Sequence, residues 1–413
     1  MAVRVLVIGS GGREHALAWK LAQASSATEL HAAPGNPGIA RLAECHPISA
    51  EDPDDVLALA RSLACDLVVV GPEAPLVAGV ADVLRHAGIA VFGPGAAAAG
   101  IEGSKSFAKE VMVAAGVPTA SRLPVARPPC VVKADGLAAG KGVVVCRTQE
   151  DVDRALSELA ALGSPLLIEE LLEGPEISLF AVCDGRTAVA LPPAQDFKRA
   201  YDGDEGPNTG GMGSYAPVPG VGDDEVTALL ERVHLPVLSE LEQRGTPFVG
   251  LLYAGLMLTS EGPKVLEFNC RFGDPETQSV LPILEGDLLE LLAAAATGDL
   301  AGIRSPGAGG AAVTVVVSAG SYPAAGDRGT PIRGIEAAEG LGALVFHAGT
   351  AVRGEELVTN GGRILGVTVL GETVADARER AYAAVGAIEI EGSRYRRDIA
   401  EAAASGWTAS LEL

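Results

Sequence analysis

The 413-residue sequence predicts a multidomain protein of α/β and α+β type. The length exceeds what one ordinary hydrophobic core holds, so two to four domains are expected. Near the N-terminus, short apolar runs alternate with helical stretches, which is typical of a doubly wound parallel sheet. Further along, β-branched runs that flank a Gly-rich turn indicate a small α+β lobe inserted into a larger one.

The parallel-sheet domain is expected over residues 1–103. A strand begins at Val3 and is followed by a helical stretch that runs through Leu21. Two later apolar runs end at Gly-Pro pairs, as strands that stop at a turn do. The expected strands are 3–8, 66–70 and 89–92.

The turn between the first strand and the first helix is Gly9-Ser10-Gly11-Gly12. Helix N-termini bind anions, so we expect a phosphate site at this turn. Dinucleotide binding would need a third glycine where this chain has Glu14, and an acidic ribose ligand about 20 residues further on. A phosphorylated small molecule is therefore the preferred ligand, and a purely structural tight turn is the alternative.

The central domain is expected over residues 104–310 and is divided into two lobes. Ser104 begins a helix that Gly116 ends, with Pro118 just beyond it. The small lobe is expected from about 118 to 188, and its hairpin could close as a lid. The other elements expected in the two lobes are helices at 149–161 and 223–243 and strands at 165–170, 190–194, 253–259 and 264–269.

A Gly-rich boundary at 302–310 precedes a last, small α/β domain, which is expected over residues 311–413. Its expected elements are strands at 313–317 and 364–369 and a helix at 373–385.

The hairpin at 131–145 is the most informative segment. Two β-branched runs flank its turn, and Lys133 and Lys141 lie at the two shoulders. Its glycines are Gly136, Gly140 and Gly142. A flexible tip of this kind can place backbone N–H groups against phosphate oxygens, with both ammonium groups close by. It is not a Walker A loop, because the Gly-Lys-Ser/Thr ending and the following helix are missing. An ordinary surface hairpin is the alternative.

The strand around 265–271 carries Glu267, Asn269 and Arg271 on one face, because successive side chains of a strand point opposite ways. Carboxylate and amide oxygens two residues apart suit Mg²⁺. The arginine could bind an anionic substrate group with two hydrogen bonds. The alternative is a solvated strand face, and the polar turn that follows, which contains Asp274, argues against it.

Two further segments have polar groups at expected turns. The first, 166–176, is a buried strand followed by an acidic, apolar connector, whose backbone and leucines could bind a purine while Glu176 accepts hydrogen bonds from ribose. An ordinary interdomain hinge is the alternative. The second is a long Gly-dense stretch, 195–213. Loops of this length are usually functional or disordered, and its β-rich flanks argue against disorder.

Composition excludes other classes. A net charge of −22 argues against a nucleic-acid-binding surface, so bound phosphates require local positive charge, a divalent metal and backbone dipoles. The six cysteines form no CxxC pair, Cys45-His46 is too isolated for a zinc site, and the six histidines show no mutual metal spacing. Without a signal-peptide pattern or a long apolar run, the protein is expected to be cytoplasmic, with no membrane contact.

In combination, these motifs resemble the phosphoribosylamine–glycine ligase family of the ATP-grasp superfamily. The resemblance covers nearly the whole chain. The segments that carry it are 9–16, 71–77, 101–109, 133–142, 195–199, 208–213, 267–276, 346–350, 359–363 and 395–399.

The resemblance implies a pre-ATP-grasp domain at 1–103, a bilobed ATP-grasp core at 104–310 and a C-terminal domain at 311–413. It also implies a reaction in which ATP, glycine and 5-phospho-β-D-ribosylamine give glycinamide ribonucleotide, ADP and phosphate through glycyl phosphate, in de novo purine synthesis. A monomer is expected, with these small molecules as its partners.

The resemblance also implies roles for individual residues. ATP would be bound by Lys105, Lys133, Gly136, Gly140, Lys141, Gly142, Glu169, Glu170, Leu171, Leu172 and Glu176. The other substrates would be bound by Gly9, Gly11, Gly12, Asp196, Lys198, Gly210, Gly211, Arg271 and Asp274. Glu267 and Asn269 would hold Mg²⁺ or Mn²⁺, and the catalytic residues would be Lys133 and Arg271.

Two other functions stay open at this point. Another ATP-grasp ligase, such as a carboxylase subunit or a formate-using enzyme, would share the hairpin and the metal strand but not the segments 195–199 and 208–213. A non-catalytic nucleotide sensor would bind ATP without turnover, which the polar face of 267–271 argues against.

Overall fold

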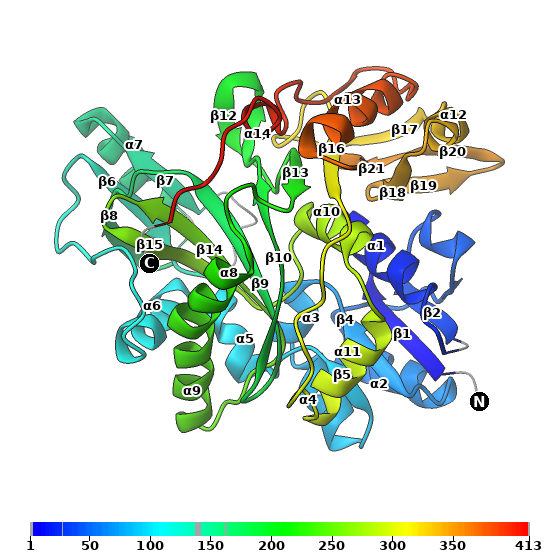
Figure 1. Cartoon of the computed structure of the whole chain (residues 1–413), viewed down its shortest axis with the longest axis horizontal. Coiled ribbons are helices and arrows are strands. Elements are labelled where there is room, and N and C mark those ends of the chain that lie inside the picture. Colours follow the sequence, from blue (N-terminus) through cyan, green and yellow to red (C-terminus); the bar gives the residue numbers. More distant parts are fainter. Residues whose placement is uncertain (1–2, 27, 137–141, 162, 412–413) are drawn as a thin grey trace.

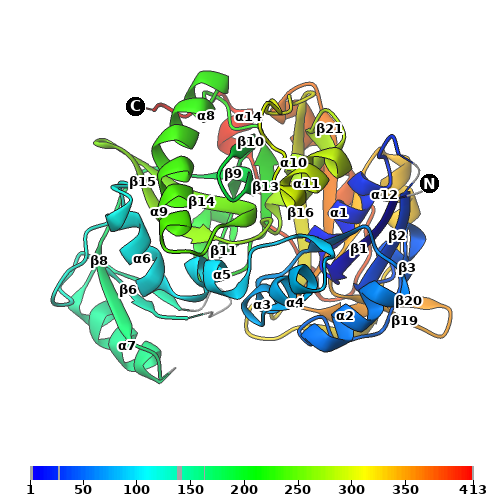
Figure 2. The ribbon, with the colours of Figure 1, turned by 90° about the horizontal axis from the view of Figure 1, so that it is seen from below.

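The computed structural model describes residues 3–26, 28–136, 142–161 and 163–411. The N-terminal parallel sheet and the small antiparallel lobe lie at opposite ends of the molecule, and the sheet of the large lobe lies between them (Figure 1). The same order is seen from below (Figure 2). The expected mixed architecture is therefore confirmed.

The N-terminal domain is a five-stranded parallel sheet in the order β3-β2-β1-β4-β5. Its central strand is buried on both faces, since Leu6 and Ile8 belong to one hydrophobic core while Val5 and Val7 belong to another. Its strands are β1 (Val3–Gly9), β2 (Thr28–Pro34), β3 (Glu44–Cys45), β4 (Leu67–Val70) and β5 (Ala90–Phe92). Its helices are α1 (Gly12–Leu21), η1 (Ile39–Arg41), α2 (Pro53–Ser62), α3 (Glu73–Val77), α4 (Val80–His86) and α5 (Ala96–Gly103).

The small lobe is a three-stranded antiparallel sheet in the order β7-β6-β8, covered by one helix and reached through α6 (Lys105–Ala114). Its elements are β6 (Cys130–Ala134), β7 (Val143–Cys146), α7 (Gln149–Ala160) and β8 (Leu166–Glu170). The expected hairpin is confirmed, with Lys133 opposite Val143. The predicted phosphate-binding residues Gly140 and Lys141 lie outside the described residues.

The large lobe is built on four antiparallel strands, which are β9 (Glu176–Asp184), β10 (Ala188–Asp196), β14 (Val249–Thr259) and β15 (Gly262–Asn269). The predicted end of the small lobe near 188 is wrong, because β9 pairs with β10 and β14 along its length and so belongs to the large lobe. The helices here are α8 (Asp223–Leu229), the π-helix η3 (Leu230–His234), α9 (Leu235–Gln243), α10 (Glu276–Ile283) and α11 (Leu288–Thr297).

The Gly-dense stretch is ordered as short elements, namely β11 (Arg199–Tyr201), η2 (Asp202–Asp204), β12 (Glu205–Asn208) and β13 (Gly213–Ala216). The last of these pairs with β10 on one side and with β16 (Ala311–Ala319) on the other. The sheet of the large lobe therefore continues into the C-terminal region as one nine-stranded sheet.

The C-terminal region adds its own core between that sheet and α13. Its other elements are β17 (Asp327–Pro331), α12 (Ile335–Gly340), β18 (Leu344–His347), β19 (Thr350–Arg353), β20 (Glu356–Gly361), β21 (Arg363–Gly371), α13 (Val374–Val385), β22 (Ser393–Arg394) and α14 (Glu401–Ala404). After α14 the chain returns to the large lobe, where the N–H of Ala409 donates to the carbonyl of Pro219. Among the described residues, no helix has the length and apolar character that crossing a membrane requires.

Candidate active site

Two lysines share one buried carboxylate in the small lobe. Glu169, which is 2% exposed, lies 2.6 Å from the ammonium of Lys133 and 2.5 Å from that of Lys109. Lys109 also donates to the hydroxyl of Thr119 and the carbonyl of Ala120, so all three of its donors have partners. Lys133 donates otherwise only to the carbonyl of Leu266 among the described residues. Lys133 is therefore the lysine with a donor left for a ligand.

Lys105 links helix α6 to the base of the hairpin. Its ammonium donates to the carbonyl of Gly136 at 2.9 Å, and the Asp135 carboxylate accepts from the backbone N–H groups of Ser106 and Gly136. Burial lowers the pKa of Lys105, and the nearby charge of Lys133 adds to this effect. The two lysines predicted to bind phosphate, Lys105 and Lys133, are thus close enough for their charges to repel each other.

Glu267 lies among these positive charges. Its carboxylate is 3.6 Å from the ammonium of Lys198, which also pairs with Glu176. Burial raises the pKa of Glu267, but Lys198 and Lys133 outweigh it and the net shift is downward. The group is therefore ionised at neutral pH, as a carboxyl group that binds a metal must be.

Arg271 is held by two acidic residues of the N-terminal domain. Its Nη2 lies 2.9 Å from Glu102 and its Nε lies 3.4 Å from Glu73. The amide oxygen of Asn269 is 3.5 Å from the same Nη2, so the predicted shared face of these two residues is present. Burial lowers the pKa of Arg271, but the two carboxylates raise it well above its ordinary value. The sequence did not single out Glu73 and Glu102, although each stands in a quoted motif.

The connector between the lobes, residues 169–172, contains two acidic residues whose side chains have protein partners and two leucines whose backbone groups have none among the described residues. The side chain of Glu170 accepts from the N–H of Ser121 and lies 3.7 Å from Lys264, so like Glu169 it is engaged within the protein. The backbone groups of Leu171 and Leu172, in contrast, make no hydrogen bond to any described residue. The leucine pair is therefore the part of the predicted adenine segment that is free to meet a base.

A second polar cluster lies beside Lys198, with residues from β9, β10, β14 and the start of α10. The hydroxyl of Tyr253 is 2.8 Å from both Ser178 Oγ and the carboxylate of Glu276, and these residues are buried. Burial raises the pKa of Asp196, with Glu276 adding to the effect and Lys198 opposing it. Sequence reasoning gave neither residue a role: Glu276 stands at the end of the quoted segment 267–276, and Tyr253 stands in no motif.

The turn after β1 is packed against acidic and basic side chains. The N–H of Gly11 donates to Glu14 at 2.6 Å, and a Cβ at Gly9 (φ +127°) would lie 2.5 Å from the same side chain. Arg13 pairs with Glu14 at 2.5 Å and donates to the carbonyl of Phe272. The turn and the start of α1 thus lie against the loop that follows β15. A Cβ at Gly12 would lie 2.7 Å from the amide of Gln278.

The predicted substrate residues Gly210, Gly211 and Asp274 meet at Arg363. Its guanidinium lies 2.9 Å from the Asp274 carboxylate and 2.6 Å from the carbonyl of Gly210. Gly211 has φ +109°, and a Cβ there would lie 2.4 Å from Pro275. Both glycines are therefore close to the loop that carries Asp274, and Arg363 joins that loop to the C-terminal region.

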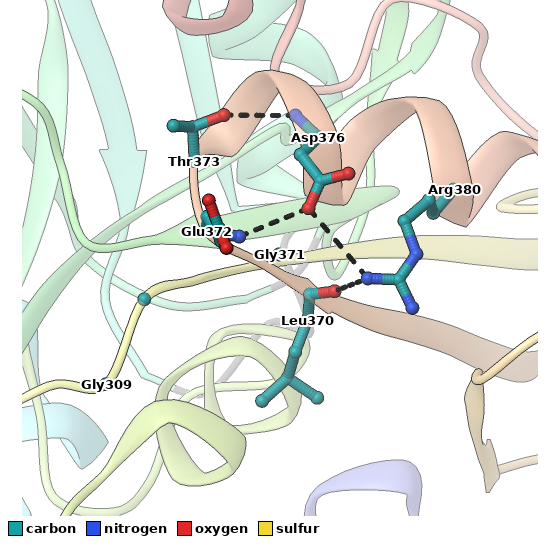
Figure 3. Close-up of a pocket in the computed structure, with 8 residues that line it drawn as sticks. Gly309, Leu370, Gly371, Glu372, Thr373, Asp376 and Arg380 are labelled. Atoms are coloured by element: carbon teal, nitrogen blue, oxygen red, sulfur yellow. Dashed lines mark hydrogen bonds and ion pairs between the residues drawn. The ribbon is translucent and has the colours of Figure 1, made fainter.

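One hollow of the surface lies away from these residues. It lies at the start of α13, and its lining residues are Gly309, Gly310, Leu370, Gly371, Glu372, Thr373, Asp376 and Arg380 (Figure 3). Asp376 caps the N–H of Glu372, and Arg380 donates to the carbonyl of Leu370. The hollow shares no residue with the predicted site, and these polar groups already have partners.

The fold and the site together define an ATP-grasp enzyme: a parallel-sheet domain, a small antiparallel lobe with a lysine-bearing hairpin, and a larger antiparallel lobe with an acidic strand. Family models for phosphoribosylglycinamide synthetase match in three parts, the N domain at 3–102, the ATP-grasp (A) domain at 103–277 and the C domain at 312–402. The chain belongs to the phosphoribosylamine–glycine ligase family.

Individual relatives agree. The chain is 52% identical to a phosphoribosylamine–glycine ligase of Streptomyces coelicolor, over 97% of this chain and 100% of the relative. It is 50% identical to that of Corynebacterium ammoniagenes, over 98% and 99%. The crystal structure of the Thermotoga maritima ligase superposes with a TM-score of 0.84 at 35% identity, over 96% of this chain and 100% of that one.

More distant structures share the fold. A biotin carboxylase domain from Hydrogenobacter thermophilus matches with a TM-score of 0.68 at 18% identity, over 96% of this chain and 92% of that one. The family models and the curated relatives show that the chain is an ATP-dependent ligase that joins glycine to phosphoribosylamine in purine biosynthesis. They favour this function over the two alternatives that the sequence left open.

Proposed function

We propose that this ligase activates glycine as glycyl phosphate in the space where Lys133, Lys105 and Lys198 surround Glu267. The observation that carries the proposal is this convergence of positive charge from both lobes on one ionised carboxylate. A carboxylate is a poor acylating agent until one of its oxygens becomes a leaving group. One carboxylate oxygen of glycine therefore attacks the γ-phosphorus of ATP, and ADP leaves.

The amine of phosphoribosylamine then attacks the acyl carbon and releases phosphate. Both steps build negative charge on phosphoryl oxygens, so catalysis depends on positioning and electrostatic stabilisation. We assign Lys133 and Lys105 to the phosphates, because Lys133 lies on the hairpin strand β6 and Lys105 reaches the base of the hairpin from α6. Gly142, Gly140 and Lys141 are assigned to supply backbone N–H groups and a further ammonium, while Gly136, whose N–H is bonded to Asp135, positions Lys105 through its carbonyl.

Glu267 and Asn269 are the proposed ligands of Mg²⁺ or Mn²⁺. Their hard oxygen donors, one ionised and one neutral, fit such an ion, which shares its remaining coordination positions with phosphates and water. The ion would offset charge on the transferred phosphoryl group. The chain's own part is to keep the Glu267 carboxylate ionised, which its lysine neighbours do.

For the nucleoside, we assign the free backbone groups of Leu171 and Leu172 to adenine. The side chains of Glu169 and Glu170 position this segment rather than touch the base, since both are engaged within the protein. Lys198 contacts Oε1 of Glu176, so Oε2 of that carboxylate is the atom assigned to the ribose hydroxyls.

For the other substrates, we assign the phosphate of phosphoribosylamine to the turn Gly9–Gly12 and the loop of Gly210 and Gly211. Both lie against the segment 272–275, where Asp274 can accept a hydrogen bond from a sugar hydroxyl. Arg271 is assigned to the glycine carboxylate and the acyl phosphate that forms from it. Asp196 and Lys198 lie next to this position. Asp196 is assigned to the ammonium of glycine, and Lys198 is assigned to the phosphoryl group that glycine receives from ATP.

The test of the reaction is phosphate release from ATP by the full-length enzyme. Release should require glycine and phosphoribosylamine together, and neither bicarbonate nor formate should replace glycine. Release with bicarbonate alone would contradict the proposal and favour a carboxylase-type reaction.

We further propose domain limits at 103/104 and 310/311, a monomeric state and a cytoplasmic location. Limited proteolysis and size-exclusion chromatography with light scattering test the first two. Cleavage inside 104–310 before cleavage near either limit, or a dimer mass, would contradict them.

A further inference from the structure

Three side chains of metal-ligating type meet at the edge of the N-terminal sheet, and none of them is assigned a role above. Strands β2 and β3 are parallel neighbours, and His31 is the register partner of Glu44. His46 follows Glu44 by two positions and its N–H donates to the carbonyl of Ala32, so the pairing continues past the strand. Because side chains alternate along a strand, Glu44 and His46 lie on the same face as His31.

The distances are those of a ligand set. Nδ1 of His31 lies 3.1 Å from Nε2 of His46 and 3.8 Å from Oε2 of Glu44, and the three ligand atoms all lie within 4.8 Å of one another. Nitrogen and oxygen ligands of a tetrahedral Zn²⁺, each about 2.0–2.1 Å from the ion, are about 3.3 Å apart. Small side-chain adjustments would therefore place all three around one ion.

A further carboxylate lies beside the central histidine. Nε2 of His31 is buried and makes no hydrogen bond to any described residue, but it lies 3.5 Å from Oε1 of Glu29. The other oxygen of Glu29 is fixed by Arg4 at 3.0 Å. A carboxylate that faces the second nitrogen of a histidine favours the tautomer whose other nitrogen is free to bind metal. Glu29 thus points Nδ1 of His31 at the ligand cluster.

The rest of the site is open on one side. The side chain of Glu44 is 71% exposed while that of His31 is 4% exposed, so a bound ion would keep a position for water. Cys45 is not a ligand, since its sulfur points the other way, toward Gly35. Two imidazoles and a carboxylate select zinc-like transition metals over Mg²⁺, which prefers oxygen ligands.

We propose that His31, Glu44 and His46 form a binding site for a divalent transition metal, Zn²⁺ first of all, that fastens β3 to β2. The site shares no residue with the proposed Mg²⁺ site. The alternative is that the two imidazoles simply hydrogen-bond to each other across their 3.1 Å separation.

Co²⁺ titration of the untagged full-length protein in excess Mg²⁺ tests the proposal. We expect one equivalent to give the visible absorption of tetrahedral or five-coordinate Co²⁺, and Zn²⁺ to displace it and raise Tm. His46→Gln and Glu44→Gln should each weaken binding at least tenfold, with ligase activity unchanged. His86→Gln is the matched control, because His86 is exposed on α4 and belongs to no cluster of metal ligands among the described residues.

Three outcomes would overturn the proposal. These are no Co²⁺ absorption in the wild-type protein, equal binding by His46→Gln, or equal loss of binding in His86→Gln. A variant that fails to fold is recognised from its circular dichroism, and Glu44→Gln, at an exposed side chain, keeps the test decisive in that case.

Discussion

The ammonium of Lys133 lies 2.6 Å from the carboxylate of Glu169, and this ion pair ties strand β6 to strand β8. The same carboxylate also binds Lys109, which has no free donor. The two lysines therefore share a structural partner but differ in what they can offer to ATP.

Replacing each lysine by methionine separates these two roles. Both Lys133→Met and Lys109→Met should destabilise the protein, by less than the roughly 3–5 kcal/mol of an isolated broken buried pair, since Glu169 keeps one cation. Only Lys133→Met should lower kcat/KM for ATP strongly, by about 10²–10³-fold, the scale of a lost electrostatic stabiliser. Steady-state kinetics and urea unfolding measure the two effects. Equal kinetic losses in both variants would contradict the assignment of Lys133.

Removing the charge of Glu267 should abolish metal-dependent turnover and leave the fold intact. Glu267→Gln loses an anionic ligand, and we expect kcat to fall by about 100-fold or more, with a higher Mg²⁺ requirement. Glu261→Gln is the matched control, because Glu261 is an exposed carboxylate whose one ion pair among the described residues is with Lys264. Turnover of Glu267→Gln within a few-fold of the wild type would refute the metal assignment.

Glu102 should act as a positioning residue for Arg271. In Glu102→Gln the side chain can still accept from the N–H of Cys270, but the charged contact to the guanidinium is lost. We expect KM for glycine to rise about tenfold, a loss of roughly 1.4 kcal/mol of binding, with KM for ATP unchanged. The comparison of the two KM values is the measurement. An equal rise in both would point to general disorder of the site instead.

Buried histidines should make stability fall with pH below about 6.5. Burial lowers the pKa of His15 to about 3 and those of His234 and His347 to about 4. Between these values and the ordinary histidine pKa, the unfolded state binds more protons, so the free energy of unfolding decreases as the pH falls. At about pH 5, the proton linkage lowers the free energy of unfolding by about 2 kcal/mol for each such histidine.

The variant His234→Gln isolates one of these contributions. Urea unfolding at about pH 7 and about pH 5 measures how much the free energy of unfolding falls between the two pH values. In His234→Gln this fall should be smaller by about 2 kcal/mol than in the wild type. The same loss in both proteins would show that His234 is not held neutral in the folded state.

Much of the fold could be predicted from periodicity and turn residues. The hairpin strands 131–145 and the helix that follows them are where the pattern places them. The end of the small lobe was wrong because a strand pattern shows that β9 exists but not which sheet it joins. For the same reason, the pairing of β13 with β16, about 100 residues apart, left no local signal.

The candidate site shows the same limit. Glycine-rich turns and the acidic strand predict ligand positions from the sequence, and the structure brings Lys133, Lys198 and Glu267 together. The supporting residues Glu102 and Lys109 were missed because their roles depend on burial and on partners distant in the chain. The cluster of His31 and His46 was missed because it forms only when two parallel strands align.

The most direct test of the acyl phosphate is the fate of glycine's carboxylate oxygen. With ¹⁸O-labelled glycine, unlabelled ATP and phosphoribosylamine, we predict that each phosphate released carries one ¹⁸O, because the oxygen that attacked phosphorus leaves with it. Phosphate without label, at a normal rate of product formation, would contradict the central claim.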